Sequence, residues 1–197
     1  MDQHIYRVCF VCSGNICRSP MAEAVFRDRL AEAGLDGRVE VSSAGTGGWH
    51  VGDPADPRTA AVLDEAGYEL AHTARQFEPE WFDRHDLVIA LDEGHERELR
   101  ALARGRADPA KVRLLRSYDP AASETDAYGL DVPDPYYGGA RGFEECLRLV
   151  EAAVPGLLAA VEAELASRGA SDGGDPGGPG DGDGGAGARA QGTGAGR

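Results

Sequence analysis

The sequence lacks any apolar run of the roughly 18–20 residues that a membrane-spanning helix requires. It is also short of positive charge, because 20 Lys and Arg stand against 34 Asp and Glu, which gives a formal net charge of −14. Such a charge argues against nonspecific binding to nucleic acid and against binding to an anionic membrane surface. The first fifteen residues contain no long apolar segment behind a basic one, so no secretory signal is predicted and we expect a cytoplasmic protein.

Cysteine is too rare for a disulfide scaffold, since only four occur in 197 residues. Cys9 and Cys12 form a C-x-x-C pair, which suits a redox couple or half of a zinc site. A zinc site needs four ligands, and the distant Cys146 has no adjacent partner, so we expect no metal. We interpret Cys9 and Cys146 as buried apolar residues. No G-x-G-x-x-G follows the first apolar segment and no G-K-[ST] occurs, so we expect no nucleotide cofactor.

Glycine is concentrated at one end of the chain, where 13 of the 28 residues fall within residues 169–197. That stretch is low-complexity Gly, Asp, Pro and Ala without apolar periodicity, and it cannot bury enough surface to offset its chain entropy. We therefore predict one folded domain over residues 1–168 and a disordered tail over 169–197.

Strand and helix patterns alternate within the folded part. Segments rich in β-branched and aromatic residues predict strands at 5–11, 38–43, 86–91 and 111–115. Helix-forming segments predict helices at 20–34, 56–67, 78–85, 93–104 and 143–168, with an interruption at Pro155 left open. Ser19 is the expected N-cap of the first helix. This order predicts an α/β fold, a small four-stranded parallel sheet with helices on both faces.

The strongest chemical pattern is VCSGNICRSP, which joins the first strand to the first helix. A loop that leads into a helix presents backbone N–H groups at the positive end of the helix dipole, and it therefore suits a bound anion. Gly14 permits close approach, and Asn15 tolerates a positive φ better than most residues other than glycine.

Three side chains of this loop add reactivity. Arg18 offers a planar fork for two phosphate oxygens. The same surroundings favour the thiolate form of Cys12, and the Ser19 hydroxyl can donate a hydrogen bond to that sulfur. A thiolate within an oxyanion cradle suits nucleophilic displacement at phosphorus.

The segment resembles the signature loop of the low-molecular-weight protein tyrosine phosphatases in its long form, C-x-G-N-I-C-R-S-P. A bare C-x5-R also suits the larger tyrosine phosphatases and the sulfurtransferases, whereas the long form after one apolar strand does not. The resemblance covers most of the folded part but not the Gly-rich tail. Further matching segments are Ser42 to Thr46, Trp49, Asp56-Pro57-Arg58, His72 to Gln76, and Asp134 to Gly138.

The resemblance implies a metal-independent protein-tyrosine phosphatase that hydrolyses phosphotyrosine and aryl phosphates through a phosphocysteine intermediate. In that scheme Cys12 attacks phosphorus and Arg18 holds the phosphoryl oxygens. Asp134 protonates the leaving phenolate and then activates water. Asp131 is the nearby alternative acid, but the two tyrosines and the glycine that follow Asp134 favour Asp134.

The resemblance also implies residues that bind the substrate and residues that support the loop. The substrate-binding set is Ser13, Gly14, Asn15, Ile16, Cys17, Ser19, Trp49, Tyr136 and Tyr137. The aromatic members would stack on the substrate ring and make the cleft too deep for phosphoserine. Ser43 and His72 would support the loop together with Asn15.

Several alternatives stay open beside this interpretation. Cys17 either forms a protective disulfide with Cys12, as the family can, or only packs. An arsenate reductase needs further cysteines after the third strand, and residues 83–106 contain none. The related arginine phosphatases look to have threonine where Ile16 stands. A noncatalytic phosphotyrosine-binding module would be expected to lose its nucleophile, arginine or acid.

We further expect a phosphotyrosine-containing protein substrate and a monomeric enzyme. Because the acidic chain should repel a dianionic substrate, we expect a locally basic mouth at the site. Candidates for that mouth are Arg18, Arg58 and Arg75. Polar residues interpreted as structural are Asp56, Asp92 and Arg75. Histidines without ligand spacing, expected at the surface, are His4, His50, His85 and His95.

Overall fold

The computed structural model describes residues 4–172, and its strands form one parallel sheet in the order β2-β1-β3-β4. The strands are β1 (Tyr6–Cys12), β2 (Val39–Gly45), β3 (Leu87–Ala90) and β4 (Val112–Leu114). The helices are α1 (Arg18–Glu32), α2 (Pro57–Glu65), α3 (Glu93–Ala103) and α4 (Ala140–Asp172), with 3₁₀ turns η1 (Pro79–Asp83), η2 (Pro109–Lys111) and η3 (Leu115–Tyr118). The predicted four-stranded parallel sheet is confirmed.

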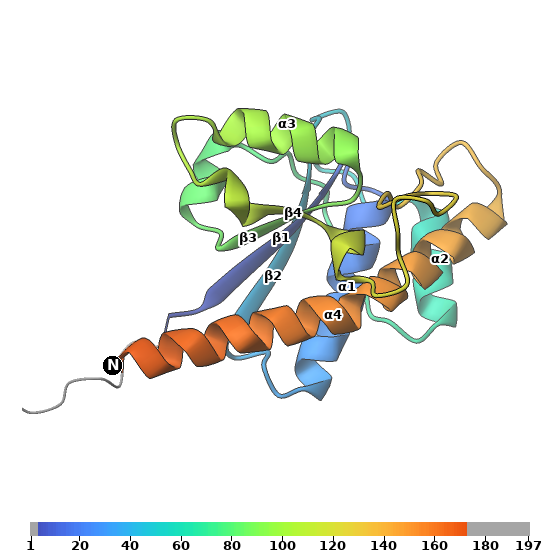
Figure 1. The fold of residues 1–197 in the computed structure, drawn as a ribbon. Helices are drawn as coiled ribbons and strands as arrows, with labels where there is room; N and C mark the ends of the chain where they lie inside the picture. Colours follow the sequence, from blue (N-terminus) through green and yellow to red (C-terminus); the bar gives the residue numbers. More distant parts are fainter. Residues whose placement is uncertain (1–3, 173–197) are drawn as a thin grey trace, which may run out of the picture.

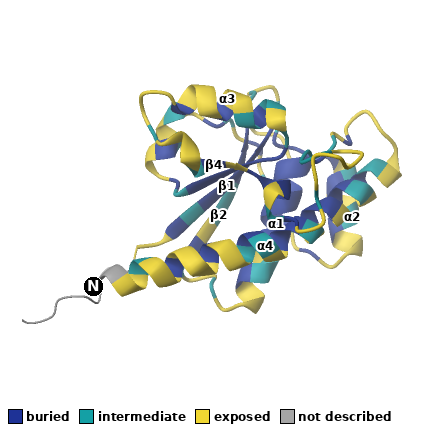
Figure 2. Ribbon diagram, in the orientation of Figure 1, coloured by how far each residue is buried: buried dark blue, intermediate teal, exposed yellow. Residues whose placement is uncertain are grey.

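Helices cover both faces of this sheet, as expected (Figure 1). Successive side chains of a strand point to opposite faces. On one face Phe10 packs edge-on against Phe26 of α1, in a core that α4 completes. On the other face Cys9 belongs to a smaller core with Leu99 of α3. Both cores are fully buried beneath helices whose outer sides are exposed (Figure 2).

The carboxyl ends of three strands bring their loops to the same edge of the sheet. Thr46, after β2, donates its backbone N–H to the carbonyl of Cys12 at the end of β1. Leu91, after β3, donates to the carbonyl of Val11, and its own carbonyl accepts from Val132. In open parallel sheets this edge is where ligands bind.

One local prediction was wrong, and one alternative left open by the sequence is resolved. Ser19 does not cap the first helix, because α1 begins at Arg18 with Cys17 in the cap position and no side-chain cap. The hydroxyl of Ser19 instead bonds within the loop that precedes the helix. The last helix is continuous through Pro155, whose ring lies on an exposed side, and it runs from Ala140 to Asp172. This helix continues four residues past its expected end at 168. Residues 173–197 of the expected tail lie outside the described residues.

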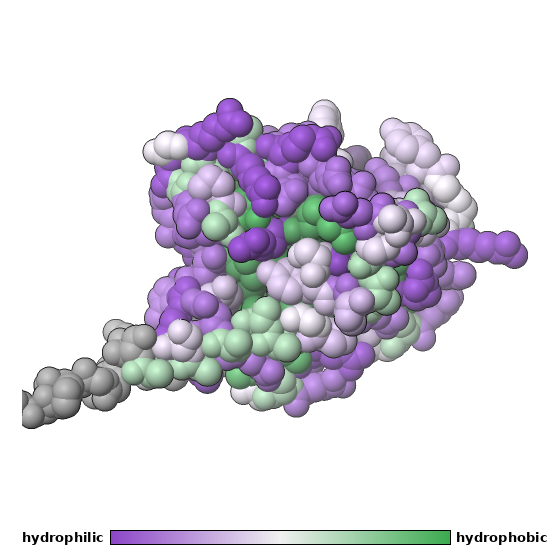
Figure 3. All heavy atoms as spheres, in the orientation of Figure 1, coloured by the Kyte–Doolittle hydropathy of each residue, from purple (hydrophilic) through white to green (hydrophobic). Residues whose placement is uncertain are grey.

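Within residues 4–172, no helix combines the length and the apolar character that crossing a bilayer demands. The face shown in Figure 3 is largely hydrophilic, and apolar residues show mainly in its recesses and along α4.

Candidate active site

The loop between β1 and α1 is held in an unusual backbone shape by one buried residue. Asn15 has φ of 58° and no exposed surface. Its side-chain amide donates to the hydroxyls of Ser19 and Ser43, both at 2.8 Å, and its Oδ1 accepts from the backbone N–H of Arg75 at 2.8 Å. A positive φ is uncommon for residues other than glycine. These three bonds hold Asn15 in that conformation.

A second set of polar groups supports this arrangement from behind. Ser43 donates to Glu23 Oε2 at 2.6 Å, and the buried Glu23 carboxylate also pairs with Arg27. His72 Nε2 lies 2.6 Å from the carbonyl oxygen of Asn15. Burial lowers the pKa of His72, which favours the neutral ring and an Nε2–H that donates to this carbonyl. Glu23 was missed by the sequence reasoning, because nothing in its helix marks it as buried.

Cys12 lies at the end of β1 with its sulfur 3.0 Å from the hydroxyl oxygen of Ser19. The Ser19 oxygen already accepts a hydrogen bond from Asn15, and its own proton has two acceptors within reach, the sulfur at 3.0 Å and the carbonyl of Ala44 at 3.3 Å. The other cysteines differ. Burial raises the pKa of Cys9 and of Cys17 to about 12, and it raises the pKa of Cys146 as well. These three are therefore thiols near neutral pH, and as expected Cys9 and Cys146 are fully buried.

Arg18 is almost fully buried, and its guanidinium spans the floor of the site. Nη1 donates to Asp92 Oδ2 at 2.8 Å and to the carbonyl of Val132 at 3.1 Å. Nη2 lies 3.4 Å from Ser13 Oγ and 3.4 Å from Asp134 Oδ2. Burial opposes the charge of Asp92, but the ring and the backbone N–H of His95 and the charge of Arg18 hold its pKa well below the usual range. Arg18 and Asp92 are thus a charged pair.

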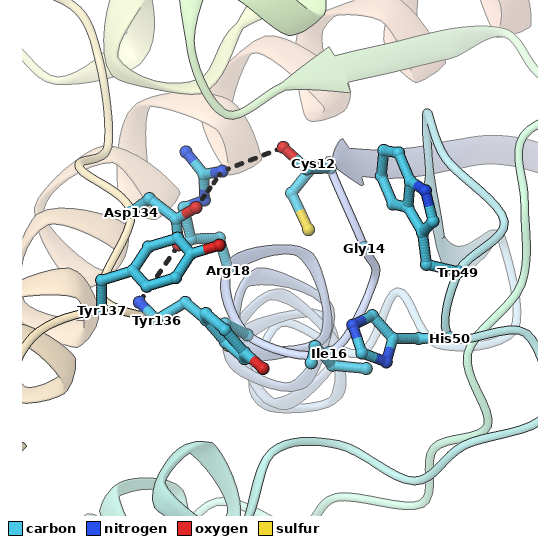
Figure 4. A pocket seen from close by; sticks show the side chains of 11 residues that line it. Cys12, Gly14, Ile16, Arg18, Trp49, His50, Asp134, Tyr136 and Tyr137 are labelled. Carbon is cyan, nitrogen blue, oxygen red and sulfur yellow. Dashed lines mark hydrogen bonds and ion pairs between the residues drawn. The ribbon is translucent and has the colours of Figure 1, made fainter.

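Asp134 stands at the rim of the cleft, with 44% of its side chain exposed. Its Oδ1 accepts from the backbone N–H of Tyr136 at 3.2 Å. The rings of Tyr136 and Tyr137 meet edge to face at 5.0 Å, and Trp49 is largely exposed across the opening. In Figure 4 the Cys12 sulfur lies between these two walls, with Asp134 on the tyrosine side.

These groups enclose a cavity of about 340 Å³. Its lining residues are Cys12, Ser13, Gly14, Ile16, Cys17, Arg18, Trp49, His50, Asp134, Tyr136 and Tyr137. Ten of the fourteen site residues named from the sequence are therefore in one cavity. The other four, Asn15, Ser19, Ser43 and His72, do not line the cavity and form a network of hydrogen bonds that supports the loop.

The expected basic mouth is not formed as predicted. The guanidinium of Arg75 packs over Trp81 at 5.6 Å and lines a different surface pocket. Arg58 pairs with Asp56 at 2.8 Å and stacks over Phe143 at 4.4 Å. Of the three arginines named, Arg18 alone is among the residues that line the described cavity.

Two of the four histidines expected at the surface are buried, and a third lines the cavity. His50 lies against Gly14, where a Cβ would approach its ring to 2.9 Å, and it lines the cavity. His85 is buried and bonds to Ser42 at 3.1 Å. His95 is buried and bonds to Ser13 Oγ at 2.8 Å. These placements depend on contacts between segments far apart in sequence, which no local pattern indicates.

No group of three His, Cys, Asp or Glu side chains among residues 4–172 converges as a metal site requires. The chemistry visible in the cavity is that of a sulfur nucleophile, a guanidinium and one rim carboxylate.

Comparison with known proteins places this cavity in a family. The model of the family "Low molecular weight phosphotyrosine protein phosphatase" matches residues 7–167. The low molecular weight protein-tyrosine-phosphatase of Streptomyces coelicolor is 67% identical over 165 residues, which cover 84% of this chain and 99% of that protein. The chain belongs to the low molecular weight protein-tyrosine phosphatase family. It is a cysteine-based hydrolase that acts on phosphotyrosine.

Solved structures agree with the assignment of this phosphatase. YfkJ from Bacillus subtilis superposes with a TM-score of 0.73 at 39% identity, covering 83% of this chain and 99% of that one. An arginine phosphatase, YwlE, superposes with a TM-score of 0.70 at 28% identity, covering 81% and 99%. In that structure a serine that replaces a cysteine in the active site is phosphorylated.

Proposed function

We propose that this phosphatase dephosphorylates tyrosine residues of proteins in two displacement steps, with Cys12 as the nucleophile. The observation that carries the proposal is the position of the Cys12 sulfur. It lies at the floor of the cavity together with Arg18, and Asp134 stands at the rim above them. One group that attacks, one that binds anionic oxygens and one that transfers a proton are the requirements of phosphomonoester hydrolysis.

In the first step the Cys12 thiolate attacks phosphorus and the bond from phosphorus to the phenolic oxygen breaks. Asp134, protonated at this stage, gives its proton to the leaving oxygen. The phosphoryl group is then held as a phosphocysteine. Since Nη1 of Arg18 is occupied by Asp92 and Val132, we expect the Nε and Nη2 edge to bind two phosphoryl oxygens.

In the second step water attacks phosphorus on the side that the phenol has left. Asp134, now a carboxylate, accepts a proton from that water, and the bond between sulfur and phosphorus breaks. The Ser19 hydroxyl, 3.0 Å from the sulfur, stabilises the departing thiolate by donating a hydrogen bond. Phosphate leaves, and the thiolate is ready for another turnover. The phosphorylated active-site serine of YwlE supports a covalent intermediate at this position.

Selectivity for an aryl ester follows from the walls of the cavity. The tyrosine pair and Trp49 stand on opposite sides of the opening and offer faces for a phenyl ring. A phosphoserine is shorter, so its phosphorus would not reach the sulfur while its backbone stays outside. Ile16 presents an apolar group to the cavity, which favours a ring over the polar guanidino group of phosphoarginine.

We also propose a redox role for Cys17. Oxidation of Cys12 by peroxide gives a sulfenic acid, and the Cys17 thiol can displace water from it to form a disulfide. That step would protect Cys12 from irreversible acids, and reduction by a thiol would restore the enzyme. Cys17→Ala should then lose its recovery from peroxide after thiol treatment, while unchanged recovery would reject the role.

The catalytic proposal is tested by hydrolysis of p-nitrophenyl phosphate in the presence of EDTA. Cys12→Ser should remove turnover, while Cys9→Ala, at a buried cysteine in the core on the other face of the sheet, should retain it. Acid quenching of the wild type during turnover of a labelled substrate should trap phosphate on the peptide that contains Cys12. A folded, reduced wild type without turnover, or label on another residue, would reject the mechanism.

The protein substrate, the monomeric state, the cytoplasmic location and the absence of nucleic-acid and membrane partners remain predictions from the sequence. Gel filtration at micromolar concentration tests the monomer directly.

A further inference from the structure

A closed ring of polar contacts joins the anion loop to the amino end of α3. His95 Nε2 lies 2.8 Å from Ser13 Oγ, and Ser13 Oγ lies 3.4 Å from Arg18 Nη2. Arg18 Nη1 donates to Asp92 Oδ2 at 2.8 Å, and Asp92 Oδ1 lies 3.0 Å from His95 Nδ1. The mechanism described above gives His95 no role. We propose that His95 is a positioning residue that fixes Arg18 for the transition state through the Ser13 hydroxyl.

The direction of the Ser13 hydroxyl carries this inference. Arg18 has only hydrogen-bond donors, so the Ser13 oxygen must accept from Nη2. A hydroxyl that turns its lone pair toward Arg18 has to direct its single proton elsewhere. The Nε2 atom of His95, at 2.8 Å, is placed to accept that proton. His95 thereby keeps the Ser13 oxygen aimed at the guanidinium.

The neighbouring Asp92 favours the tautomer of His95 that can accept the Ser13 proton. Nε2 accepts a proton only if the imidazole carries its proton on Nδ1. Nδ1 faces the Asp92 carboxylate at 3.0 Å, which favours a proton there although the contact is too poorly aligned for a full hydrogen bond. Asp92 Oδ1 also accepts from the backbone N–H of His95 at 2.8 Å and so caps α3. The ring of His95 is only 5% exposed, which shields these contacts from water.

Arg18 needs such a constraint because two acceptors compete for Nη2. Asp134 on the exposed rim and Ser13 in the anion loop each lie 3.4 Å from Nη2. A guanidinium that turned toward Asp134 would offer the phosphoryl group a different edge. The transition state depends on donors that are already aimed at the oxygens, so a misdirected Arg18 should slow the chemical step more than it weakens substrate binding.

The test is a set of variants assayed with p-nitrophenyl phosphate. His95→Ala and Ser13→Ala should each lower kcat about tenfold with KM changed less than twofold, which is the scale of one hydrogen bond to a charged network. The double variant should be no slower than either single one, because both remove the same link. Multiplied losses in the double variant would overturn the proposal.

Two conservative variants separate the contact with Ser13 from the contact with Asp92. The amide of Gln reaches about as far as Nε2, so His95→Gln should recover most of the lost kcat. The amide of Asn reaches only as far as Nδ1, so His95→Asn should resemble His95→Ala. The reverse order would assign the role of the His95 ring to its contact with Asp92 and overturn the proposal.

Ligand binding supplies a readout that a purely structural role would not move. Inhibition by vanadate, which mimics the five-coordinate phosphorus, should weaken about tenfold in His95→Ala, while inhibition by inorganic phosphate should change less than twofold. Equal weakening of both would reject the proposal. His85→Ala is the matched control, because His85 is also buried and bonds to a serine, but away from the cavity. It should lose stability and keep its kcat.

Discussion

The anion loop, residues 12–19 from the end of β1 to the start of α1, and the acid loop, residues 131–138 around Asp134, meet in one cavity, yet they are held in opposite ways. In the anion loop Asn15, Arg18 and Ser19 are buried, and each makes at least two hydrogen bonds. In the acid loop the rim residues are open to solvent, and Tyr137 is 92% exposed.

Hydrogen bonds hold the acid loop on either side of Asp134. Val132 donates to the carbonyl of Leu91, and Asp131 accepts from the backbone N–H of Glu93 at 2.8 Å. Beyond Asp134, the carbonyl of Gly138 accepts from Arg58 at 3.2 Å. The phosphoryl group is the same in every substrate, and it binds to donors held in place by the anion loop. The leaving group and the peptide around it differ between substrates, and they contact the exposed acid loop.

The largest effect should come from breaking the fixed loop at Arg18. Arg18→Lys keeps the positive charge but loses the planar fork that binds two oxygens, so kcat should fall roughly 1,000-fold with a smaller change in KM. Steady-state kinetics with p-nitrophenyl phosphate measures this. Arg58→Lys, at an arginine outside the cavity lining, should stay within about threefold of wild type. A fully active Arg18→Lys would show that charge alone suffices.

The acid loop is probed next through Asp134. Asp134→Asn cannot donate a proton to the phenol, so kcat with phosphotyrosine should fall about 100-fold. The loss should shrink with substrates whose leaving group is a weaker base, because these need less protonation. A plot of log kcat against leaving-group pKa measures this.

The matched control for that experiment is Asp131→Asn, at the alternative acid. Asp131 accepts from the amino end of α3 and has no contact with Arg18 among the described residues, so its variant should lose some stability and little activity. If Asp131→Asn showed the stronger dependence on leaving group, the acid would have been assigned to the wrong residue.

The same contrast explains how much the sequence could predict. The anion loop is one continuous segment, so its chemistry was visible in Cys12, Asn15 and Arg18 without any tertiary information. The parallel sheet followed from the alternation of strands and helices, and its register places β1 in the middle. Ser19 was assigned to the helix end by its local propensity, but its hydroxyl bonds to Cys12 and Asn15 instead.

What the sequence could not predict are the contacts between segments that are distant in the chain. His95 lies 82 residues from Ser13, and Glu23 lies 20 residues from Ser43. Arg75 looked like part of a basic mouth, but only its backbone reaches the anion loop while its side chain packs on Trp81. Such pairs form because the sheet brings its carboxyl-end loops together, and composition carries no record of which residues then meet.

A smaller effect should follow from loosening the anion loop from behind. Ser43→Ala removes a bond to Asn15 and one to Glu23, and it leaves both groups buried without that partner. The free energy of unfolding should fall by about 1–3 kcal/mol, and kcat roughly tenfold. Urea denaturation measures the first quantity. Ser42→Ala is the control, since its hydroxyl faces His85 on the other side of the sheet, and it should keep full kcat. An equal loss of kcat in both variants would contradict a specific role for Ser43.

The smallest effect belongs to the most exposed part of the acid loop. Tyr137 touches the cavity with a ring that is 92% exposed, so Tyr137→Ala should leave the melting temperature unchanged. Loss of one aromatic contact with the substrate ring should raise KM for phosphotyrosine peptides about threefold and leave kcat intact, because the ring takes no part in the chemical step. Tyr128→Ala, at an exposed tyrosine outside the cavity, serves as the control. A fall in kcat for Tyr137→Ala would mean that the ring also orders Asp134, and the open loop would then be less independent of the chemistry than its exposure indicates.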